Sequence, residues 1–229
     1  MAQKRVTLVS VSGIDGAGKS TLINLLRAGL TSKGVQTDIF SFWDRGAAFP
    51  RVREFISHAV FRGDRGIGSA TRPVSRQDKN IQTWYMTGAR LCLYLLDTIH
   101  LRWMVARVKA SPTEVAVFDR YIYDELANLP LNRWFIRAYV RMLVRVAPHP
   151  DIAYLVDADP VLARGRKPEY PLEFLYRNRA SYLTLSQWVR GMIVIGPLPP
   201  PGTEQDEVAQ KILRKLSFHY LRQFPPVAA

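Results

Sequence analysis

Apolar runs alternate with longer stretches of helical periodicity along the chain. Five runs rich in β-branched and aromatic residues predict buried strands, at residues 5–11, 37–43, 115–119, 152–157 and 192–195. Apolar residues at helical spacing predict helices from residue 21 onward and near residues 51–61, 77–109, 131–147, 172–189 and 204–221. Strands that alternate with helices favour a parallel sheet. The sequence therefore predicts an α/β fold, a three-layer sandwich in which helices flank a five-stranded parallel sheet.

The chain of 229 residues is predicted to form a single domain, 1–229. Residues 62–75 are rich in Gly, Ser, Arg and Pro and predict a mobile loop. Residues 197–202 form a proline-rich connector. The sequence contains no repeat and no interdomain linker.

The composition indicates the cellular compartment in which the protein is expected. The one cysteine, Cys92, excludes an internal disulfide and fits a reducing, cytoplasmic compartment; its apolar surroundings predict a packed thiol. The first residues lead straight into a strand, which leaves no room for a signal peptide. No apolar run approaches the roughly 20 residues of a membrane span, and the four histidines are too scattered to suggest a metal cluster.

The formal net charge of +13 is carried mostly by arginine, which suits anionic ligands. The basic residues are spread along the chain with no run of five or six together. A generally basic surface is therefore favoured over a dedicated nucleic-acid face.

One short segment carries the strongest chemical signal. Residues 13–20, Gly-Ile-Asp-Gly-Ala-Gly-Lys-Ser, fit G-x-x-x-x-G-K-[ST] between a predicted strand and a predicted helix. Backbone N–H groups in such a loop converge on a polyphosphate at the positive end of a helix. The chemistry predicts that Lys19 reaches the β and γ phosphates of ATP and that the Ser20 hydroxyl ligates Mg²⁺. The predicted ATP-binding residues are Gly13, Gly16, Ala17, Gly18, Lys19, Ser20 and Thr21.

Other polar residues are predicted to meet this loop. In an open parallel sheet, ligands gather at the carboxyl ends of the strands. That rule gathers Asp15, residues 43–45, Asp119, Arg120 and residues 157–159 around one crevice.

Four segments, in order along the chain, form a set that is specific in combination. They are the loop 13–21 with Asp15 in third place, Gly88-Ala89-Arg90, Asp119-Arg120-Tyr121, and Phe174-x-x-Arg177-x-Arg179-x-x-Tyr182. Together they resemble the thymidylate kinase family of P-loop nucleoside monophosphate kinases.

The resemblance implies Mg²⁺-dependent phosphoryl transfer from ATP to a nucleoside monophosphate, most directly dTMP. It implies that Asp15 contacts the acceptor sugar, Arg90 reads the base, Asp119 lies near Mg²⁺ and Arg120 binds the acceptor phosphate. Arg177 and Arg179 add cations around the two phosphate groups. Family members are commonly dimers, so a homodimer is also an expectation.

Residues 157–167 resemble the family's strand end and the entrance to a lid, here a short one near 160–171. Some relatives place an arginine where this chain has Gly16. The catalytic cation is therefore expected from the lid, with Arg164, Arg166 and Lys167 as candidates, or else these residues form a solvated helix end.

The chain departs from the family on the acceptor side. Residues 43–48 replace the usual R-x-P-G-G stretch, where Arg45 is the candidate to keep the phosphate-binding role. Met86 stands where the family usually stacks a phenylalanine on thymine. Residues 123–126 replace the Ser and Ala-Tyr that usually follow Asp-Arg-Tyr.

Two alternative functions stay open. A deoxynucleoside kinase, or another small-molecule kinase, would need a carboxylate base, for which Asp44 is placed near the second strand. A non-catalytic ATP-binding protein at a membrane or partner has no need of acceptor-side cations, so Asp119, Arg120 and the two arginines of 177–179 argue against it.

A row of arginines marks the helix at 131–147. Arg133, Arg137, Arg141 and Arg145 recur every four residues and share one helix face. Such a helix can lie on an anionic membrane or bind an acidic partner, but an outer helix with a wet basic side is the favoured interpretation.

Overall fold

The computed structural model describes residues 6–42 and 84–197. Its strands are β1 (Thr7–Ser12), β2 (Thr37–Ser41), β3 (Val115–Asp119), β4 (Ile152–Val156) and β5 (Met192–Ile195). They form one five-stranded sheet in the order β2-β3-β1-β4-β5, and the four pairings between these strands are all parallel. The five predicted strands and the α/β fold are therefore confirmed.

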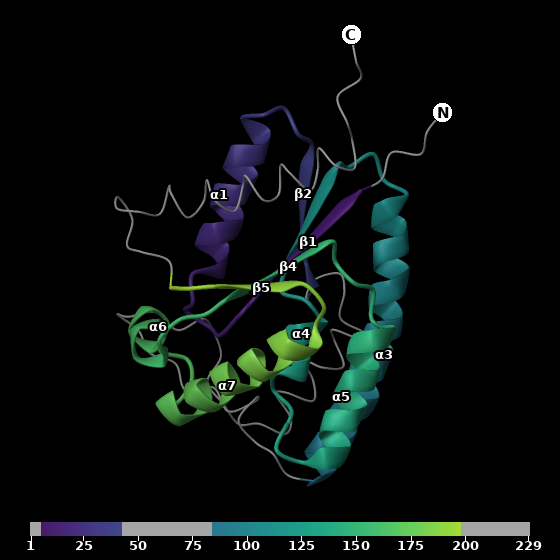
Figure 1. The fold of residues 1–229 in the computed structure, drawn as a ribbon. Helices are drawn as coiled ribbons and strands as arrows, with labels where there is room; N and C mark the ends of the chain where they lie inside the picture. The colour runs from purple at the N-terminus through teal and green to yellow at the C-terminus, as the bar shows by residue number, and fades with distance from the viewer. Residues whose placement is uncertain (1–5, 43–83, 198–229) are drawn as a thin grey trace.

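The described helices cover the sheet and its carboxyl end (Figure 1). They are α1 (Lys19–Thr31), α3 (Trp84–Lys109), α4 (Ile122–Leu126), α5 (Trp134–Val146), α6 (Pro160–Arg166) and α7 (Leu172–Trp188). Figure 1 shows α1 on one side of the sheet and α3 with α5 on the other. This arrangement is the three-layer sandwich of P-loop NTPases that the sequence predicts.

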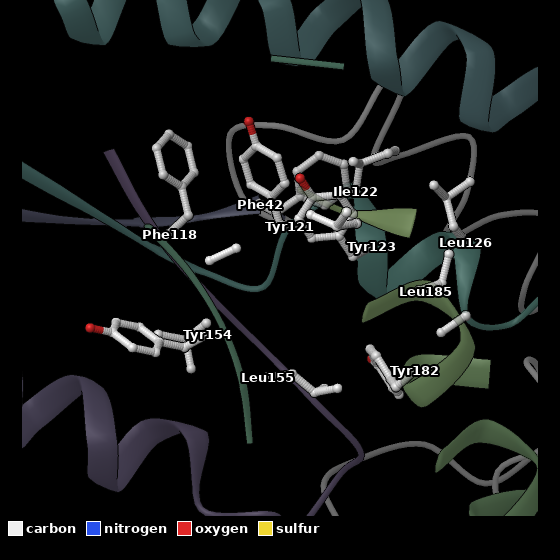
Figure 2. Packing of buried hydrophobic residues seen from close by; sticks show 14 of the residues in the cluster. Phe42, Phe118, Tyr121, Ile122, Tyr123, Leu126, Tyr154, Leu155, Tyr182 and Leu185 are labelled. Carbon is white, nitrogen blue, oxygen red and sulfur yellow. The ribbon is translucent and has the colours of Figure 1, made fainter. Parts of the chain in front are cut away.

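Burial explains why these runs form strands. All six residues of β1 and all five of β4 are buried, as expected for central strands covered by helices on both faces. Figure 2 shows part of this core, with Phe118 and Tyr121 grouped on one side of the sheet and Tyr154 on the other. The Phe118 and Tyr121 rings meet edge to face with centroids 5.5 Å apart.

The register brings the ends of three strands together. In β1, Val11 lies opposite Asp119 of β3 and Ser12 lies opposite Leu155 of β4. Ser12, which precedes the glycine loop, is therefore one residue further along the sheet than Asp119.

Two short helices, α4 and α6, are absent from the sequence prediction, which follows periodicity over longer windows. Several predicted segments lie outside the described residues: the helices at 51–61 and 204–221, the loop at 62–75, the first part of the helix at 77–109, and the connector beyond residue 197.

The prediction of a packed Cys92 is wrong, because the thiol is exposed. Its neighbours two positions away, Arg90 and Tyr94, are both buried in α3. Residues two apart on a helix face in different directions, so Cys92 faces outward even though the stretch around it is apolar.

Candidate functional site

The glycine loop joins β1 to α1 and depends on glycine at two close approaches. Gly13, at φ 148°, lies so near β4 that a Cβ there would meet the Val156 carbonyl oxygen at 2.5 Å. Gly16, at φ 83°, lies against α6, where a Cβ would collide with the Ala163 carbonyl oxygen. Both residues therefore need a left-handed or otherwise restricted backbone and an empty Cβ position.

A cavity of about 550 Å³ opens at this loop. Its lining brings together residues from the loop, the end of β3 and the end of α6: Asp15, Gly16, Gly18, Lys19, Ser20, Thr21, Asp119, Arg120, Arg166 and Lys167. Most of the predicted catalytic, ATP-binding and metal-binding residues thus share one space, although they come from distant parts of the sequence.

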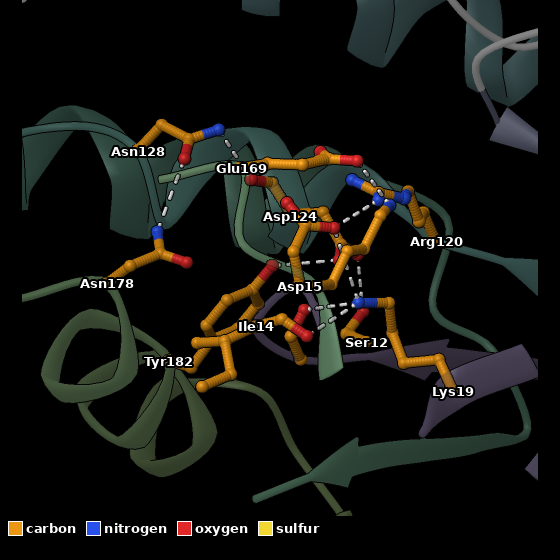
Figure 3. A network of polar contacts seen from close by, with 12 residues as sticks. Ser12, Ile14, Asp15, Lys19, Arg120, Asp124, Asn128, Glu169, Asn178 and Tyr182 are labelled. Carbon is orange, nitrogen blue, oxygen red and sulfur yellow. Dashed lines mark hydrogen bonds and ion pairs between the residues drawn. The ribbon is translucent and has the colours of Figure 1, made fainter. Parts of the chain in front are cut away.

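Asp15 lies between two cations of this cavity (Figure 3). It accepts a hydrogen bond from Arg120 Nη2 at 2.5 Å, and its Oδ1 lies 4.0 Å from Lys19 Nζ. Lys19 also donates to the carbonyl oxygens of Gly13 at 2.7 Å and Ile14 at 2.9 Å. The loop therefore holds the ammonium of its own lysine, which is buried.

Arg120 has an unusual backbone. Its φ of 68° makes it the single non-glycine residue with positive φ among the described residues. Burial opposes its charge, but Asp15 and Asp124 outweigh burial and raise the pKa of the guanidinium above its ordinary value. The carboxylates therefore favour the charged form of Arg120.

Asp119 stands beside Arg120 with a carboxylate that is harder to ionise. Burial raises its pKa above the ordinary value, and the charges of Lys19 and Arg120 offset only part of that rise. An added cation near Asp119 would favour its ionised form.

Helix α6 forms one wall of the cavity and occupies the first part of the predicted lid. Asp159 caps it, accepting from the N–H groups of Val161 at 2.9 Å and Leu162 at 3.2 Å. The three candidate cations separate here: Arg166 and Lys167 line the cavity, whereas Arg164 is exposed and does not. Glu169, only 1% exposed, holds Lys167 at 3.2 Å.

The two arginines of α7 do not reach this cavity. Arg179 pairs with Asp157 at the end of β4 through two hydrogen bonds of 2.6 and 2.7 Å. Arg177 lies 5.5 Å from the Phe174 ring centroid and lines a second cavity of about 410 Å³. Residues two apart on a helix face different ways, which separates them. Their substrate-binding role stays a prediction.

The remaining acceptor-side candidates are only partly described. Arg90 is 8% exposed on the inner face of α3 and does not line the 550 Å³ cavity. Met86 belongs to α3, but its side chain lies outside the described part of the structure, as do Asp44 and Arg45 entirely. Their predicted roles stay predictions.

The sequence reasoning missed a polar cluster behind the cavity. Asp124 of α4 accepts hydrogen bonds from Ser12 at 2.7 Å and Tyr182 at 2.8 Å. The Asn128 side-chain amide donates to the Asp124 backbone carbonyl oxygen, and its Oδ1 accepts a hydrogen bond from Asn178 Nδ2 at 3.2 Å. One feature of the sequence could have indicated this cluster. In a capping box, an acidic side chain three positions after the N-cap residue accepts the backbone N–H of that residue. Asp124 stands three positions after Tyr121, and the Tyr121 N–H donates to its carboxylate.

The row of Arg133, Arg137, Arg141 and Arg145 is exposed throughout; Arg133 is the N-cap of α5 and the other three lie within the helix. Two of them, Arg137 and Arg141, lie 5.6 and 4.7 Å from the Trp188 ring centroid of α7. Part of the row therefore packs α5 on α7 through cation–π contacts, which agrees with the interpretation of an outer helix with a basic side.

Within residues 6–42 and 84–197, no group of three or more His, Cys, Asp or Glu could hold a metal ion. No helix in that part of the chain is long and apolar enough to cross a membrane.

Comparisons with known proteins give a consistent result. No protein-family model matches the chain. The chain is 27% identical to a thymidylate kinase of Bifidobacterium longum over 189 residues, which are 78% of this chain and 82% of that protein. It is 28% identical to a probable thymidylate kinase of Pyrobaculum aerophilum over 232 residues, 93% of this chain and all of that protein. A probable thymidylate kinase of Metallosphaera sedula is 24% identical over 206 residues, 85% of this chain and 86% of its own length.

Proposed function

The chain is a relative of the thymidylate kinases, and on this premise we propose that it transfers a phosphoryl group from ATP to a nucleoside monophosphate, with dTMP as the acceptor. One observation carries the proposal. A single cavity joins the glycine loop, with Asp15 and Lys19, to Asp119 and Arg120 at the end of β3, so groups suited to two phosphates face one space.

The donor side is supported by the loop and the start of α1. Backbone N–H groups of the loop are the donors that would hold a polyphosphate, and the N-terminus of α1 adds positive potential. Lys19 lines the same cavity and supplies a charge for the β and γ phosphates of ATP.

The acceptor side rests on Arg120 and Asp15. Arg120 carries a guanidinium whose planar donors suit a phosphate, and its charge is secured by nearby carboxylates. In the family resemblance, Arg120 binds the acceptor phosphate and Asp15 contacts the sugar. Their ion pair keeps the two groups adjacent.

The residues present fit a magnesium ion. The hydroxyl of Ser20 and the carboxylate of Asp119 both line the cavity, and oxygen is the donor that Mg²⁺ prefers. Mg²⁺ usually takes only one or two protein ligands, with waters and substrate phosphates completing the set. Bound there, it would neutralise phosphate charge during transfer.

This chemistry depends on positioning and charge neutralisation more than on proton transfer. The acceptor phosphate is already ionised, so no strong general base is required. Lys19 and Arg120 flank the loop, and Arg166 with Lys167 faces it from α6. These cations would stabilise the charge that spreads over the transferred group.

A panel of acceptors tests the proposal. ADP release from Mg-ATP is followed with the four deoxynucleoside monophosphates, UMP and the matching nucleosides. Selective turnover with dTMP supports the proposal. Turnover of nucleosides alone would replace it with a kinase that phosphorylates a hydroxyl group. ATP binding without turnover of any acceptor would favour a non-catalytic role.

A further inference from the structure

Asp124 is a buried carboxylate that does not line the cavity. Only 3% of it is exposed. It receives hydrogen bonds from the Ser12 hydroxyl at 2.7 Å, the Tyr121 N–H at 2.9 Å and the Tyr182 hydroxyl at 2.8 Å. Because a buried charge is costly unless it is hydrogen-bonded, three donors on one carboxylate indicate a built arrangement.

The three donors come from three places around the site, and Figure 3 shows two of them, Ser12 and Tyr182, beside Asp124. Ser12 is the last residue of β1 and directly precedes Gly13 of the phosphate loop. Tyr121 directly follows Arg120. Tyr182 belongs to α7. The Asp124 carboxylate therefore links the residue before the loop to the residue after Arg120, and it links both to α7.

These hydrogen bonds lie next to a residue with a strained backbone, Arg120. A non-glycine residue in the left-handed region costs about 1–2 kcal/mol and persists only where its surroundings hold it. Arg120, at φ 68°, is held on one side by its own N–H, which donates to the Val11 carbonyl at 3.1 Å. The Tyr121 N–H bond to Asp124 holds the next peptide.

We propose that Asp124 is a positioning residue for phosphoryl transfer: it fixes the Arg120 guanidinium relative to the phosphate loop. The inference rests on the proposed function. It follows that loss of Asp124 weakens use of the acceptor, whereas ATP remains bound by the loop backbone and Lys19.

Two substitutions of Asp124 and one control distinguish a positioning role from a contribution to stability alone. Asp124→Asn keeps one acceptor oxygen for Ser12 and Tyr121, and its amide can donate to the Tyr182 hydroxyl. Asp124→Ala removes all three hydrogen bonds of the carboxylate. Asp151→Ala is the matched control, since Asp151 accepts the Leu8 N–H at 2.8 Å near the opposite end of β1.

The experiment measures kcat and KM for dTMP, the Kd for ATP by calorimetry, and hydrogen exchange of residues 119–124, in the full chain. Asp124→Ala should lower kcat/KM for dTMP on the order of 100-fold, as small misplacements of catalytic groups do. Its Kd for ATP should stay near the wild-type value, and the Tyr121 amide should exchange faster. Asp124→Asn should stay within about tenfold of wild type, the effect of roughly one weakened hydrogen bond.

A loss of kcat/KM in Asp124→Ala no larger than in Asp151→Ala would overturn the inference. So would an equal loss of ATP affinity. If Asp124→Ala does not fold, Asp124→Ser replaces it, because one hydroxyl cannot receive all three donors.

Absence of turnover in the wild type would instead refute the proposed function. Exchange at Tyr121 would then decide the positioning claim, and unchanged exchange in the variants would overturn it.

Discussion

Arg120 combines a strained backbone with a secured charge. Its left-handed φ turns the chain directly after β3, so the guanidinium meets Asp15 of the loop and does not continue along the strand. Strain of this kind is typical of functional sites, where surrounding contacts hold a conformation that the residue itself disfavours. The sequence motif predicts the presence of this arginine, but only the structure reveals how it is turned.

Removal of a site cation should be severe. We expect Lys19→Ala and Arg120→Ala each to lower kcat/KM by about 10²–10³-fold, the usual effect of deleting a group that stabilises transition-state charge. Steady-state kinetics with Mg-ATP and dTMP provide the measurement. Arg145→Ala, an exposed arginine on α5, is the control and should be neutral. Near-normal activity in either site variant would contradict the assignment.

Gly16 should not tolerate even one methyl group. A Cβ there would collide with the Ala163 carbonyl of α6, and its φ of 83° disfavours any L side chain. We expect Gly16→Ala to weaken ATP binding at least tenfold, measured by calorimetry. Gly34→Ala is a matched control, because Gly34 also has positive φ but a Cβ there would meet no described residue within 4 Å. Equal ATP affinity in both variants would show that the contact with α6 is unimportant.

At the scale of elements, long periodic segments are predictable and short ones are not. The strands and helices α5 and α7 agree with their predicted bounds to within a few residues, because apolar spacing repeats several times in each. The five residues of α4 and seven of α6 hold too few turns to show a period. Asp159-Pro160 is nonetheless a helix-start signal, a capping residue followed by proline in the first turn.

Helix α6 should depend on its cap. Asp159→Ala removes the acceptor for two N–H groups, and we expect a loss of about 1 kcal/mol in the free energy of unfolding. Because α6 carries Arg166 into the cavity, kcat should also fall. Asp159→Ser keeps a capping oxygen and should restore both quantities. Urea unfolding and kinetics are the measurements, and identical values for Ala and Ser would argue against a capping role.

For the whole molecule, the sequence predicts which residues approach the loop but not how side chains pair. Asp15, Asp119 and Arg120 converge because parallel strands end at one edge. The Asp124 cluster depends on how α7 packs on α4. Such packing joins residues 58 apart in the chain, as in the Tyr182–Asp124 bond, and leaves no local pattern.

The buried tyrosines should make stability fall at high pH. Burial raises the pKa of Tyr121, Tyr123, Tyr154 and Tyr182 above the ordinary value, and that of Tyr139 to about 12. In the unfolded chain they lose protons near pH 10. The unfolded state then binds fewer protons than the folded state, so the free energy of unfolding should decline as pH rises from about 10 toward 12.

Urea unfolding at pH 9 and pH 11 measures this decline. Tyr154→Phe keeps the buried ring and removes a hydroxyl that has no hydrogen-bond partner among the described residues. The variant should therefore lose less stability than wild type between the two pH values. An equal loss in both proteins would contradict the link to Tyr154.

We infer that one cavity accommodates both ATP and an acceptor phosphate. The identity of the product tests this inference when wild-type protein is incubated with ATP, Mg²⁺ and dTMP. We predict that the γ-phosphoryl group of ATP appears in dTDP, and that Arg120→Ala forms far less of it. ATP hydrolysis to ADP and free phosphate at the same rate with and without dTMP, and no dTDP, would show that the cavity does not transfer the group to dTMP.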